Sequence, residues 1–224
     1  MICEKAVVLF SGGLDSTTVL AYAVSKGFDI TPLTFSYGQR HSIEVEKASL
    51  ALRKYGLWNK SAVFNIDLSV FSNCSLLNSG IEIPKDPDKG IPSTYVPSRN
   101  LIFLSIAAGF AETIDASRIF IGVNSVDYSG YPDCRPEFIR KFNETVSVGT
   151  KKGVESSIIV EAPLIDMSKK EIIQLGISLG VDYSMTHSCY NPSENGLSCG
   201  VCDSCRLRLE GFRQAGMKDP LDYI

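Results

Sequence analysis

The segment SGGLDSTT, residues 11–18, places two adjacent glycines among four hydroxyl side chains and one carboxylate. It follows the apolar run 6–10 and leads into the apolar segment VLAYAV. Glycines let backbone N–H groups approach an anion closely, and the N-terminus of a helix adds a favourable dipole. The residue types and their position therefore predict a phosphate-binding loop between a first strand and a first helix.

This loop differs from two common nucleotide-binding loops. It lacks the lysine that follows the glycines in a Walker A sequence, and it does not have G-x-G-x-x-G spacing. The alternative is an ordinary turn in which Asp15 or Ser16 caps the helix. Because the glycines and hydroxyl groups gather at the expected ligand edge of an α/β sheet, phosphate binding is the favoured interpretation.

A second cluster lies towards the C-terminal end, where four of the seven cysteines follow the pattern C-x9-C-x2-C-x2-C. Thiolates two residues apart can bind one ion, and four sulfur ligands without histidine are typical of structural zinc. The predicted ligands are Cys189, Cys199, Cys202 and Cys205, with His187 as a bystander. Free buried thiols are the weaker alternative, whereas an iron–sulfur cluster stays open because four cysteines can also hold one.

Three further polar stretches carry candidate binding residues. They are residues 35–44 with Arg40 and His41, residues 96–103 with Arg99 and Asn100, and residues 122–138 with Asp127, Tyr128, Tyr131, Asp133 and Arg135. Two of the three directly follow predicted strands, at the ligand edge of such a sheet. A solvated loop is the alternative for each stretch. The recurrence of tyrosine, arginine and aspartate at one edge favours a binding site.

Short apolar runs bounded by turn or charged residues predict five strands buried on both faces. These runs are residues 6–10, 30–35, 61–66, 118–123 and 157–162. Helical patterns lie at residues 17–26, 43–55, 101–114 and 168–179, the first two ending at Gly27 and Gly56 and the last opening with the capping box of Ser168 and Glu171. The alternation predicts an α/β fold: a doubly wound, mostly parallel five-stranded sheet with helices on both faces.

Length and charge limit the classes of protein that are compatible with the chain. Its 224 residues suit one domain, residues 1–224, with the four-cysteine segment at about residues 186–215. A net charge of −3 argues against binding to a nucleic-acid backbone. The short apolar stretches predict neither a signal peptide nor a membrane span, so we expect a cytoplasmic protein with no membrane partner. Residues 67–98, rich in Asn, Ser, Pro, Gly and Asp, predict either disorder or a functional lid.

The loop resembles SGGxDS, the signature of the PP-loop ATP pyrophosphatases, whose fold is adenine nucleotide hydrolase-like. Along the whole chain, the sequence resembles one family of that superfamily, 7-cyano-7-deazaguanine synthase. The matching segments occur in order: FSGGLDSTT, TFSYGQRH, VPSRN, DYSGYPDCRPEF and CGVCDSC. Ser98 is a departure, because the family often has glycine there, and the spacer between Cys189 and Cys199 varies in the family.

The resemblance implies an ATP-dependent carbon–nitrogen ligase of queuosine biosynthesis. Its substrates would be 7-carboxy-7-deazaguanine, ammonia and ATP, and its products 7-cyano-7-deazaguanine (preQ0), AMP and pyrophosphate. The reaction would pass through an adenylated carboxylate and an amide, with the loop gripping the leaving pyrophosphate. The resemblance also implies Mg²⁺ with the ATP, one structural zinc ion per chain and a homodimer.

The same resemblance suggests roles for individual residues. Ser11, Asp15 and Ser16 are candidate catalytic residues, and Asp15 would organise the metal or the ATP, a role compatible with helix capping. The candidate ATP contacts are Phe10, Ser11, Gly12, Gly13, Leu14, Asp15, Ser16, Thr17, Thr18, Val19 and Leu20.

Substrate recognition follows from the shape of a deazaguanine, which has N–H donors on its pairing edge and a flat face. A carboxylate suits the donors and an aromatic ring suits the face. Asp127 or Asp133 would accept from the edge, with Tyr131 nearby. Arg99 and Asn100 complete the candidate substrate-binding residues.

Two other classes of protein remain as alternatives. A PP-loop tRNA-modifying (thiolation) enzyme would need a surface for nucleic acid, and this acidic chain has no appended basic domain. A zinc-ribbon binding module would not need the phosphate loop. ATP consumption that depends on the small acid distinguishes the synthase from both.

Overall fold

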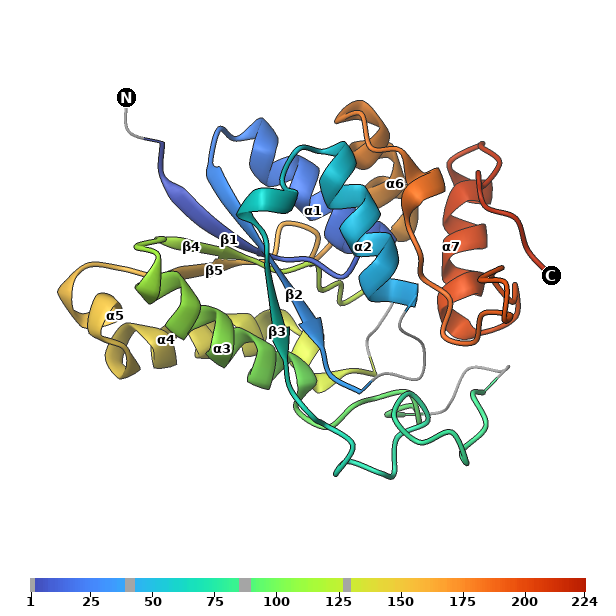
Figure 1. The fold of residues 1–224 in the computed structure, drawn as a ribbon, viewed down its shortest axis with the longest axis horizontal. Coiled ribbons are helices and arrows are strands. Elements are labelled where there is room, and N and C mark those ends of the chain that lie inside the picture. Colours follow the sequence, from blue (N-terminus) through green and yellow to red (C-terminus); the bar gives the residue numbers. More distant parts are fainter. Residues whose placement is uncertain (1–2, 39–42, 85–89, 127–129) are drawn as a thin grey trace.

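Five parallel strands form the centre of the fold in the computed structural model, which describes residues 3–38, 43–84, 90–126 and 130–224 (Figure 1). The strands are β1 (Lys5–Leu9), β2 (Asp29–Ser36), β3 (Ala62–Asn65), β4 (Arg118–Phe120) and β5 (Ile159–Glu161). Their order in the sheet is β3-β2-β1-β4-β5, and all four neighbouring pairs are parallel. The predicted fold class is confirmed.

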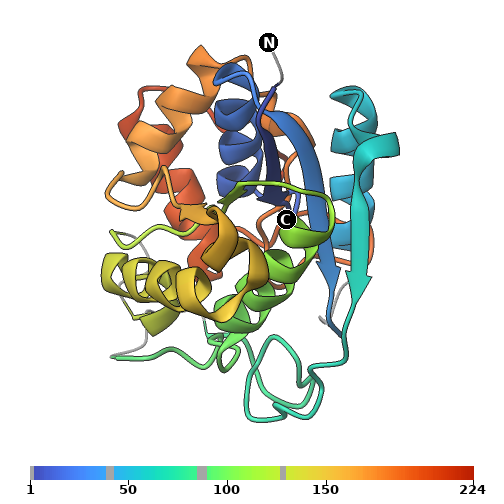
Figure 2. The ribbon, with the colours of Figure 1, turned by 90° about the vertical axis from the view of Figure 1, so that its left-hand side faces the viewer.

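Alternating side chains of β1 separate two hydrophobic cores, because successive residues of a strand point to opposite faces. Ala6, Val8 and Phe10 pack on one face, and Val7 and Leu9 on the other. The first face is covered by α1 (Leu14–Ser25), α2 (Ile43–Lys54), α6 (Lys169–Ser178) and α7 (Asp203–Gln214). The second face is covered by α3 (Arg99–Thr113) and α4 (Pro136–Gly149), followed by the short α5 (Lys151–Glu155). Figure 2 shows the blue, orange and red helices on one side and the green and yellow helices on the other.

The strand order places a switch point between β1 and β4. From β1 the chain continues outward to β2 and β3, then returns to β4 on the opposite side of β1 and continues to β5. The loops after β1 and β4 therefore diverge to opposite faces, which leaves a crevice at the carboxyl ends of the strands. The turn at residues 11–13, the first part of the predicted phosphate-binding loop, lies at this crevice.

Several predicted helix ends are confirmed. Gly27 and Gly56 have positive φ angles of 81° and 67°, the left-handed conformation of a helix C-terminal glycine. Ser168 and Glu171 form both hydrogen bonds of a capping box, and α6 begins at the next residue. The first helix begins at Leu14, three residues before the predicted start at Thr17, because Gly13 takes the N-cap position.

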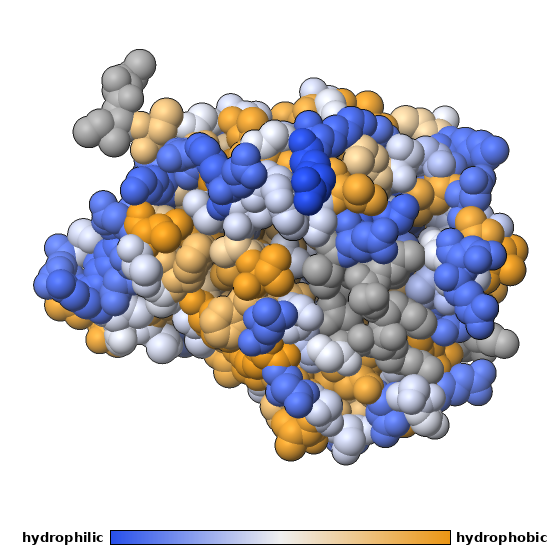
Figure 3. All heavy atoms as spheres, viewed as in Figure 1, coloured by the Kyte–Doolittle hydropathy of each residue, from blue (hydrophilic) through white to orange (hydrophobic). Residues whose placement is uncertain are grey.

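The prediction that all strands are buried on both faces is wrong for β3. Its residues Val63 and Phe64 are 45% and 42% exposed, because β3 is an edge strand paired only with β2. Ile159 of the opposite edge strand, β5, is 38% exposed. Figure 3 shows hydrophobic surface gathered over the region of β3 and α3.

The described parts of residues 67–98 contain no helix or strand, yet they are packed against the core. Leu68, Cys74, Leu76, Ile83 and Val96 are all buried in the cluster that includes α3. This packing contradicts disorder for residues 67–84 and 90–98. Among the residues that the structure describes, no helix combines the length and the apolar character needed to cross a membrane.

Candidate active site

The turn after β1 has a shape that requires glycine. Gly12 has a φ of +77°, and a Cβ atom there would lie 2.8 Å from the backbone nitrogen of Ala48 in α2. Gly13 is the N-cap of α1 and provides no side-chain cap. No side chain of the N-cap residue therefore occupies the first-turn amides of α1, an arrangement that suits an anion.

Two serine hydroxyl groups meet at this turn. Ser16 Oγ lies 3.1 Å from Ser11 Oγ, accepts a hydrogen bond from the Ser11 amide at 3.2 Å and donates to the Gly13 carbonyl at 3.2 Å. The backbone amide of His187 donates to the Gly12 carbonyl at 3.0 Å, which fixes the turn from the opposite side. The loop is thus held in place before any ligand binds.

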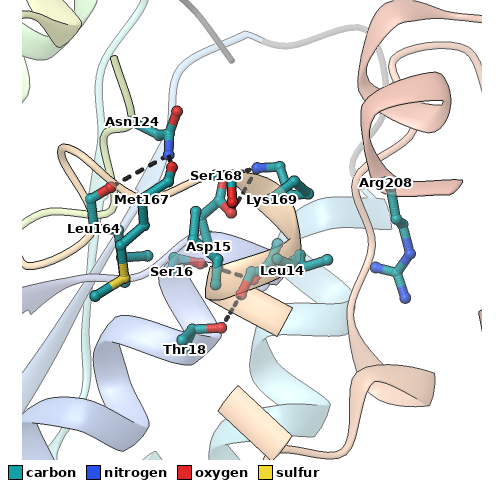
Figure 4. Close-up of polar contacts among 12 residues, drawn as sticks. Leu14, Asp15, Ser16, Thr18, Asn124, Leu164, Met167, Ser168, Lys169 and Arg208 are labelled. Atoms are coloured by element: carbon teal, nitrogen blue, oxygen red, sulfur yellow. Dashed lines mark hydrogen bonds and ion pairs between the residues drawn. The ribbon is translucent and has the colours of Figure 1, made fainter. Parts of the chain in front are cut away.

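One cavity of about 260 Å³ opens over this turn. Of the candidate ATP contacts, the residues that line it are Phe10, Ser11, Gly13, Leu14, Asp15 and Ser16. The remaining five do not line it. Thr17 Oγ1 donates to the Gly13 carbonyl. The fully buried Thr18 donates to the Leu14 carbonyl (Figure 4) and also bonds the Tyr183 hydroxyl. Val19 and Leu20 lie in the core of the first face.

Asp15 is paired with a lysine that the sequence analysis did not identify. Lys169 Nζ lies 2.8 Å and 2.9 Å from the two carboxylate oxygens of Asp15, and both residues line the cavity (Figure 4). The lysine side chain is only 7% exposed. Its sequence signal was the S-K-K-E capping box after the fifth strand, which we interpreted only as the start of a helix.

Aromatic side chains from four parts of the chain line another part of the cavity. The rings of Phe35 and Phe103 are stacked with centroids 4.0 Å apart and planes 3° apart. Tyr37 meets Phe103 edge-on at 5.3 Å, and Tyr131 and Tyr190 also line the cavity. Flat apolar walls of this kind suit a planar heterocycle.

Arg99, the first residue of α3, lies among these rings. Its Nη1 donates to the Tyr37 hydroxyl at 3.3 Å, and its guanidinium lies 5.9 Å from the Tyr37 ring centroid. Within the described part of the chain, no carboxylate forms an ion pair with Arg99. A cation beside flat rings in a cavity can bind a planar anion.

Asn100 and Asp133 are in contact, and only Asn100 lines the cavity. The Asp133 carboxylate accepts the Asn100 backbone amide at 3.0 Å, and Asn100 Nδ2 donates to the Asp133 carbonyl at 3.1 Å and to Cys134 Sγ at 3.4 Å. The Asp133 carboxylate therefore accepts a hydrogen bond from a backbone amide in the first turn of α3, where amides have no partner within the helix. Burial raises the pKa of its carboxyl group and raises that of the Cys134 thiol to about 12. Asp127 lies outside the described residues, as do Arg40, His41 and Tyr128.

Arg208 also lines the cavity, but it is committed to neighbouring groups. It forms a two-point ion pair with Asp219 at 2.7 Å and 3.0 Å, and it donates to Thr186 Oγ1 at 2.6 Å and to the Tyr183 carbonyl at 3.0 Å. Its side chain is 2% exposed. These contacts fix α7 to the segment before it and to the C-terminal segment.

The four predicted metal ligands converge. The sulfur atoms of Cys189, Cys199, Cys202 and Cys205 all lie within 4.8 Å of one another. Cys199 Sγ and Cys205 Sγ are 4.0 Å apart. A tetrahedral zinc ion with Zn–S bonds of about 2.3 Å would separate its sulfurs by about 3.8 Å, so the cluster fits such an ion with a small contraction.

Backbone amides support the same site. The amides of Asn191 and Cys199 approach Cys189 Sγ at 3.3 Å and 3.2 Å, and the Cys202 amide approaches Cys199 Sγ at 3.4 Å. Such donors stabilise thiolates. Hydrogen bonds from the Cys189 and Cys205 thiols lower the pKa of Cys202. None of the seven cysteines forms a disulfide bond.

A glycine-rich turn at the switch point of a parallel sheet, opening a helix without a side-chain cap, defines a nucleotide-binding α/β protein of the PP-loop type. The solved structure of NMN synthetase from Francisella tularensis has a similar fold, with a TM-score of 0.52 and 16% identity over 96% of this chain and 79% of that chain.

The particular family follows from the sequence. The model of the family described as queuosine biosynthesis protein QueC matches residues 5–216, and the chain belongs to this family. It is 54% identical to the 7-cyano-7-deazaguanine synthase of Desulfatibacillum aliphaticivorans, over 99% of this chain and 97% of that protein. It is 56% identical to the enzyme of that name from Geobacter sp. (strain M21), over 98% of each chain. The family resemblance is confirmed.

Proposed function

We propose that the protein catalyses the ATP-dependent conversion of 7-carboxy-7-deazaguanine and ammonia into 7-cyano-7-deazaguanine in queuosine biosynthesis. The observation that carries this proposal is the membership of nearly the full chain in the QueC family. The cavity supports it, because a phosphate-binding turn and an aromatic compartment that contains Arg99 share one space. An adenylating enzyme needs both compartments side by side.

The chemistry requires two activations. A carboxylate is a poor electrophile because its leaving group would be an oxide, so one oxygen attacks the α phosphorus of ATP and pyrophosphate leaves. Ammonia then displaces AMP and gives the primary amide. The amide oxygen is activated in the same way, and loss of the second AMP gives the nitrile. The protein's task is to hold the reacting groups and to stabilise the charge that develops.

Residues of the phosphate loop would hold ATP in the part of the cavity that lies over the turn after β1. The first-turn amides of α1 and the hydroxyl groups of Ser11 and Ser16 would bind the phosphates of ATP. Asp15 offers the carboxylate oxygens that Mg²⁺ prefers, and it lies at the cavity wall. Bound Mg²⁺ would supply charge neutralisation for the phosphates.

At the other end, the stacked rings of Phe35 and Phe103 would form a wall for the deazaguanine, with Tyr131 beside it. Arg99 would bind the carboxylate of the substrate, since planar guanidinium and carboxylate groups pair at two points. Asn100, near the start of α3, would also contact the substrate. Asp127 is the remaining candidate for the pairing edge of the base, together with Asp133 if its carboxylate turns from the Asn100 amide.

The cysteine cluster would hold one structural zinc ion per chain, because four protein ligands leave no open position. Metal analysis tests this assignment, and iron with sulfide in the purified protein would contradict it.

We further propose a homodimer in the cytoplasm, for which the exposed apolar side chains of β3 and α3 are the first candidate interface. Light scattering at working concentration tests the oligomeric state.

The deciding experiment measures all products of one reaction mixture. The purified protein is incubated with 7-carboxy-7-deazaguanine, ammonium, ATP and Mg²⁺, and products are identified by mass. We expect the nitrile, with two AMP and two pyrophosphate per nitrile, and we expect the amide to be converted when supplied directly. A control mixture without the acid should consume no ATP. ADP as the main nucleotide product would refute the mechanism.

A further inference from the structure

The aromatic compartment of the cavity has to bind two different substrates in the proposed reaction. The carboxylate of the acid only accepts hydrogen bonds, whereas the primary amide accepts through its oxygen and donates through its nitrogen. Arg99 has N–H donors and no acceptor, so it suits the acid but places a donor opposite the N–H of the amide. The compartment therefore needs a group that donates in the first activation and accepts in the second.

A buried pair of hydroxyl groups can meet this need. Tyr131 lines the cavity together with Arg99, and its hydroxyl oxygen lies 2.6 Å from Thr94 Oγ1. Tyr131 is 7% exposed and Thr94 is 3% exposed, and either hydroxyl group of the pair can be the donor. We propose that Thr94 is a positioning residue that lets Tyr131 bind both substrates, an inference that rests on the proposed function. Tyr131 donates to the carboxylate of the acid, and it accepts an N–H of the amide while donating to Thr94.

Packing between two separate segments of the chain fixes the position of this pair. The rings of Tyr95 and Tyr131 lie with their centroids 5.9 Å apart. A Cβ atom at Gly130 would lie 2.7 Å from the Gly90 carbonyl oxygen, so the segment before α3 runs directly along the segment that carries Tyr131. The described residues of 67–98 thereby bring the Thr94 hydroxyl group to the Tyr131 hydroxyl group, and they have a role in substrate binding through this contact.

The Tyr131 hydroxyl group keeps its proton at neutral pH. Burial raises the pKa of this phenol above its ordinary value, although the hydrogen bond with Thr94, the charge of Arg99 and a hydrogen bond with Tyr190 act in the opposite direction. Tyr131 therefore has one proton to donate, either to the carboxylate of the acid or to Thr94. When Thr94 receives it, the Tyr131 oxygen can accept the N–H of the amide. The amide oxygen, which is the atom to be activated, is then left for ATP.

Two other polar side chains of the compartment are less suited to this exchange. The Tyr37 hydroxyl group already accepts a hydrogen bond from Arg99 Nη1 at 3.3 Å. Asn100 Nδ2 donates to the Asp133 carbonyl at 3.1 Å, and the amide oxygen of Asn100 is an acceptor that cannot serve a carboxylate. A hydroxyl group that is bonded to another hydroxyl group can reverse the direction of its hydrogen bond, because each of them can donate or accept.

The test measures binding of 7-carboxy-7-deazaguanine and of its primary amide separately, by calorimetry without ATP. Thr94→Val keeps the shape of the side chain and removes its hydroxyl group. With the amide bound, the Tyr131 proton then loses its acceptor, so we expect the amide to bind about 10-fold more weakly. With the acid bound, this proton goes to the carboxylate, so the affinity for the acid should change by less than about 3-fold. Thr94→Ser should restore the affinity for the amide.

Tyr183→Phe is the matched control, because the hydroxyl groups of Tyr183 and Thr18 form a similar buried pair at 2.8 Å and neither residue lines the cavity. It should leave the ratio of the two affinities unchanged, whereas Tyr131→Phe should weaken binding of both compounds. Turnover gives a second readout. With the acid, ammonium, ATP and Mg²⁺, Thr94→Val should release more of the amide into solution than the unaltered protein does.

Melting temperature shows whether each variant is folded, and Thr94→Ala, which removes the same hydroxyl group, decides if Thr94→Val does not fold. An unchanged ratio of amide affinity to acid affinity in the folded variant would overturn the inference and indicate Asn100 as the acceptor, while the proposed function stands. Failure of the unaltered protein to bind the amide would also overturn it. Binding of both compounds without nitrile formation in the presence of ATP would refute the proposed function, and the affinity ratio of Thr94→Val would still decide the role of Thr94.

Discussion

Ser98 adopts a backbone conformation that favours glycine. Its φ is 57° at the N-cap of α3, directly before Arg99, and its side chain makes no capping hydrogen bond. A left-handed conformation costs a residue with a Cβ atom about 1–2 kcal/mol. The chain therefore carries a strained residue beside its candidate substrate arginine.

We expect Ser98→Gly to raise the free energy of unfolding by about 0.5–1 kcal/mol, because glycine relieves the strain but has more conformational freedom when unfolded. Urea unfolding measures the change. Ser105→Gly is the control, since Ser105 is exposed in the interior of the same helix, and it should lower stability by about 0.5 kcal/mol. A loss of stability in Ser98→Gly as large as in the control would show that Ser98 is not strained.

The buried Asp133 predicts that the free energy of unfolding depends on pH. Burial raises the pKa of its carboxyl group above the ordinary value in the folded protein. The folded state therefore binds the proton more tightly than the unfolded state. The stabilising contribution of this group is fully present below its ordinary pKa, and it is lost as the pH rises through the raised folded value.

Asp133→Asn removes this titration and keeps an oxygen that can accept the Asn100 amide. We expect the stability difference between the unaltered protein and this variant to shift in favour of the variant as the pH rises from about 4 to about 8. Urea unfolding at several pH values measures the difference, in which titrations common to both proteins cancel. A difference independent of pH would contradict the raised pKa.

The loop residues at the site were predictable because they are contiguous, whereas Lys169 was not. Ser11, Asp15 and Ser16 stand in one motif, and five residues of it fold directly into the cavity wall. Lys169 lies 154 positions from Asp15, and only the parallel sheet brings the two together. Asn124 lies within residues 122–138, which the sequence predicts to be a binding stretch, but its hydrogen bonds go to carbonyls 40 and 43 positions away.

At the scale of elements, two helices, α4 and α7, are also not predicted from the sequence. α4 is absent from the helices that the sequence predicts, although its buried Ile139, Phe142 and Val146 have helical spacing, because the polar residues before it favour a loop. α7 gave no apolar pattern to recognise. Its buried residues include Ser204, Cys205, Arg208 and Gly211, so the cysteine cluster and an ion pair replace much of the usual hydrophobic face.

Two helix glycines provide a matched pair of substitutions. A Cβ atom at Gly176 of α6 would lie 1.9 Å from the Tyr183 hydroxyl oxygen and 3.1 Å from Thr18 Oγ1, whereas one at Gly109 of α3 would meet nothing within 4 Å. We expect Gly176→Ala to lower the free energy of unfolding by about 1–3 kcal/mol through overpacking. Gly109→Ala should raise it by about 0.5–1 kcal/mol through helix propensity.

Chemical denaturation of both variants measures these effects. Because α6 carries Lys169, Gly176→Ala should also weaken pyrophosphate binding, and Gly109→Ala should not. Equal stability changes of the same sign in the two variants would show that the contact between α1, α6 and Tyr183 does not constrain the helix position.

At the scale of the whole molecule, the cysteine cluster is connected to the phosphate site through α7. Cys202 is the N-cap of this helix and Cys205 lies in its first turn. About one turn after Cys205, Arg208 forms an ion pair with Asp219, and about one turn later Gly211 lies over the stem of Lys169. The cysteine cluster therefore holds one end of a helix whose middle forms part of the cavity wall.

We expect removal of the metal by a chelator to lower the melting temperature and to weaken pyrophosphate binding together, because a closed zinc site contributes folding free energy and α7 would lose its fixed start. Readdition of zinc should restore both. Cys202→Ser should behave like the metal-free protein, whereas Cys3→Ser, at an exposed cysteine outside the cluster, should bind metal and pyrophosphate normally. If the metal-free protein melts at a lower temperature but binds pyrophosphate with unchanged affinity below that temperature, the cluster stabilises the fold without positioning the phosphate site.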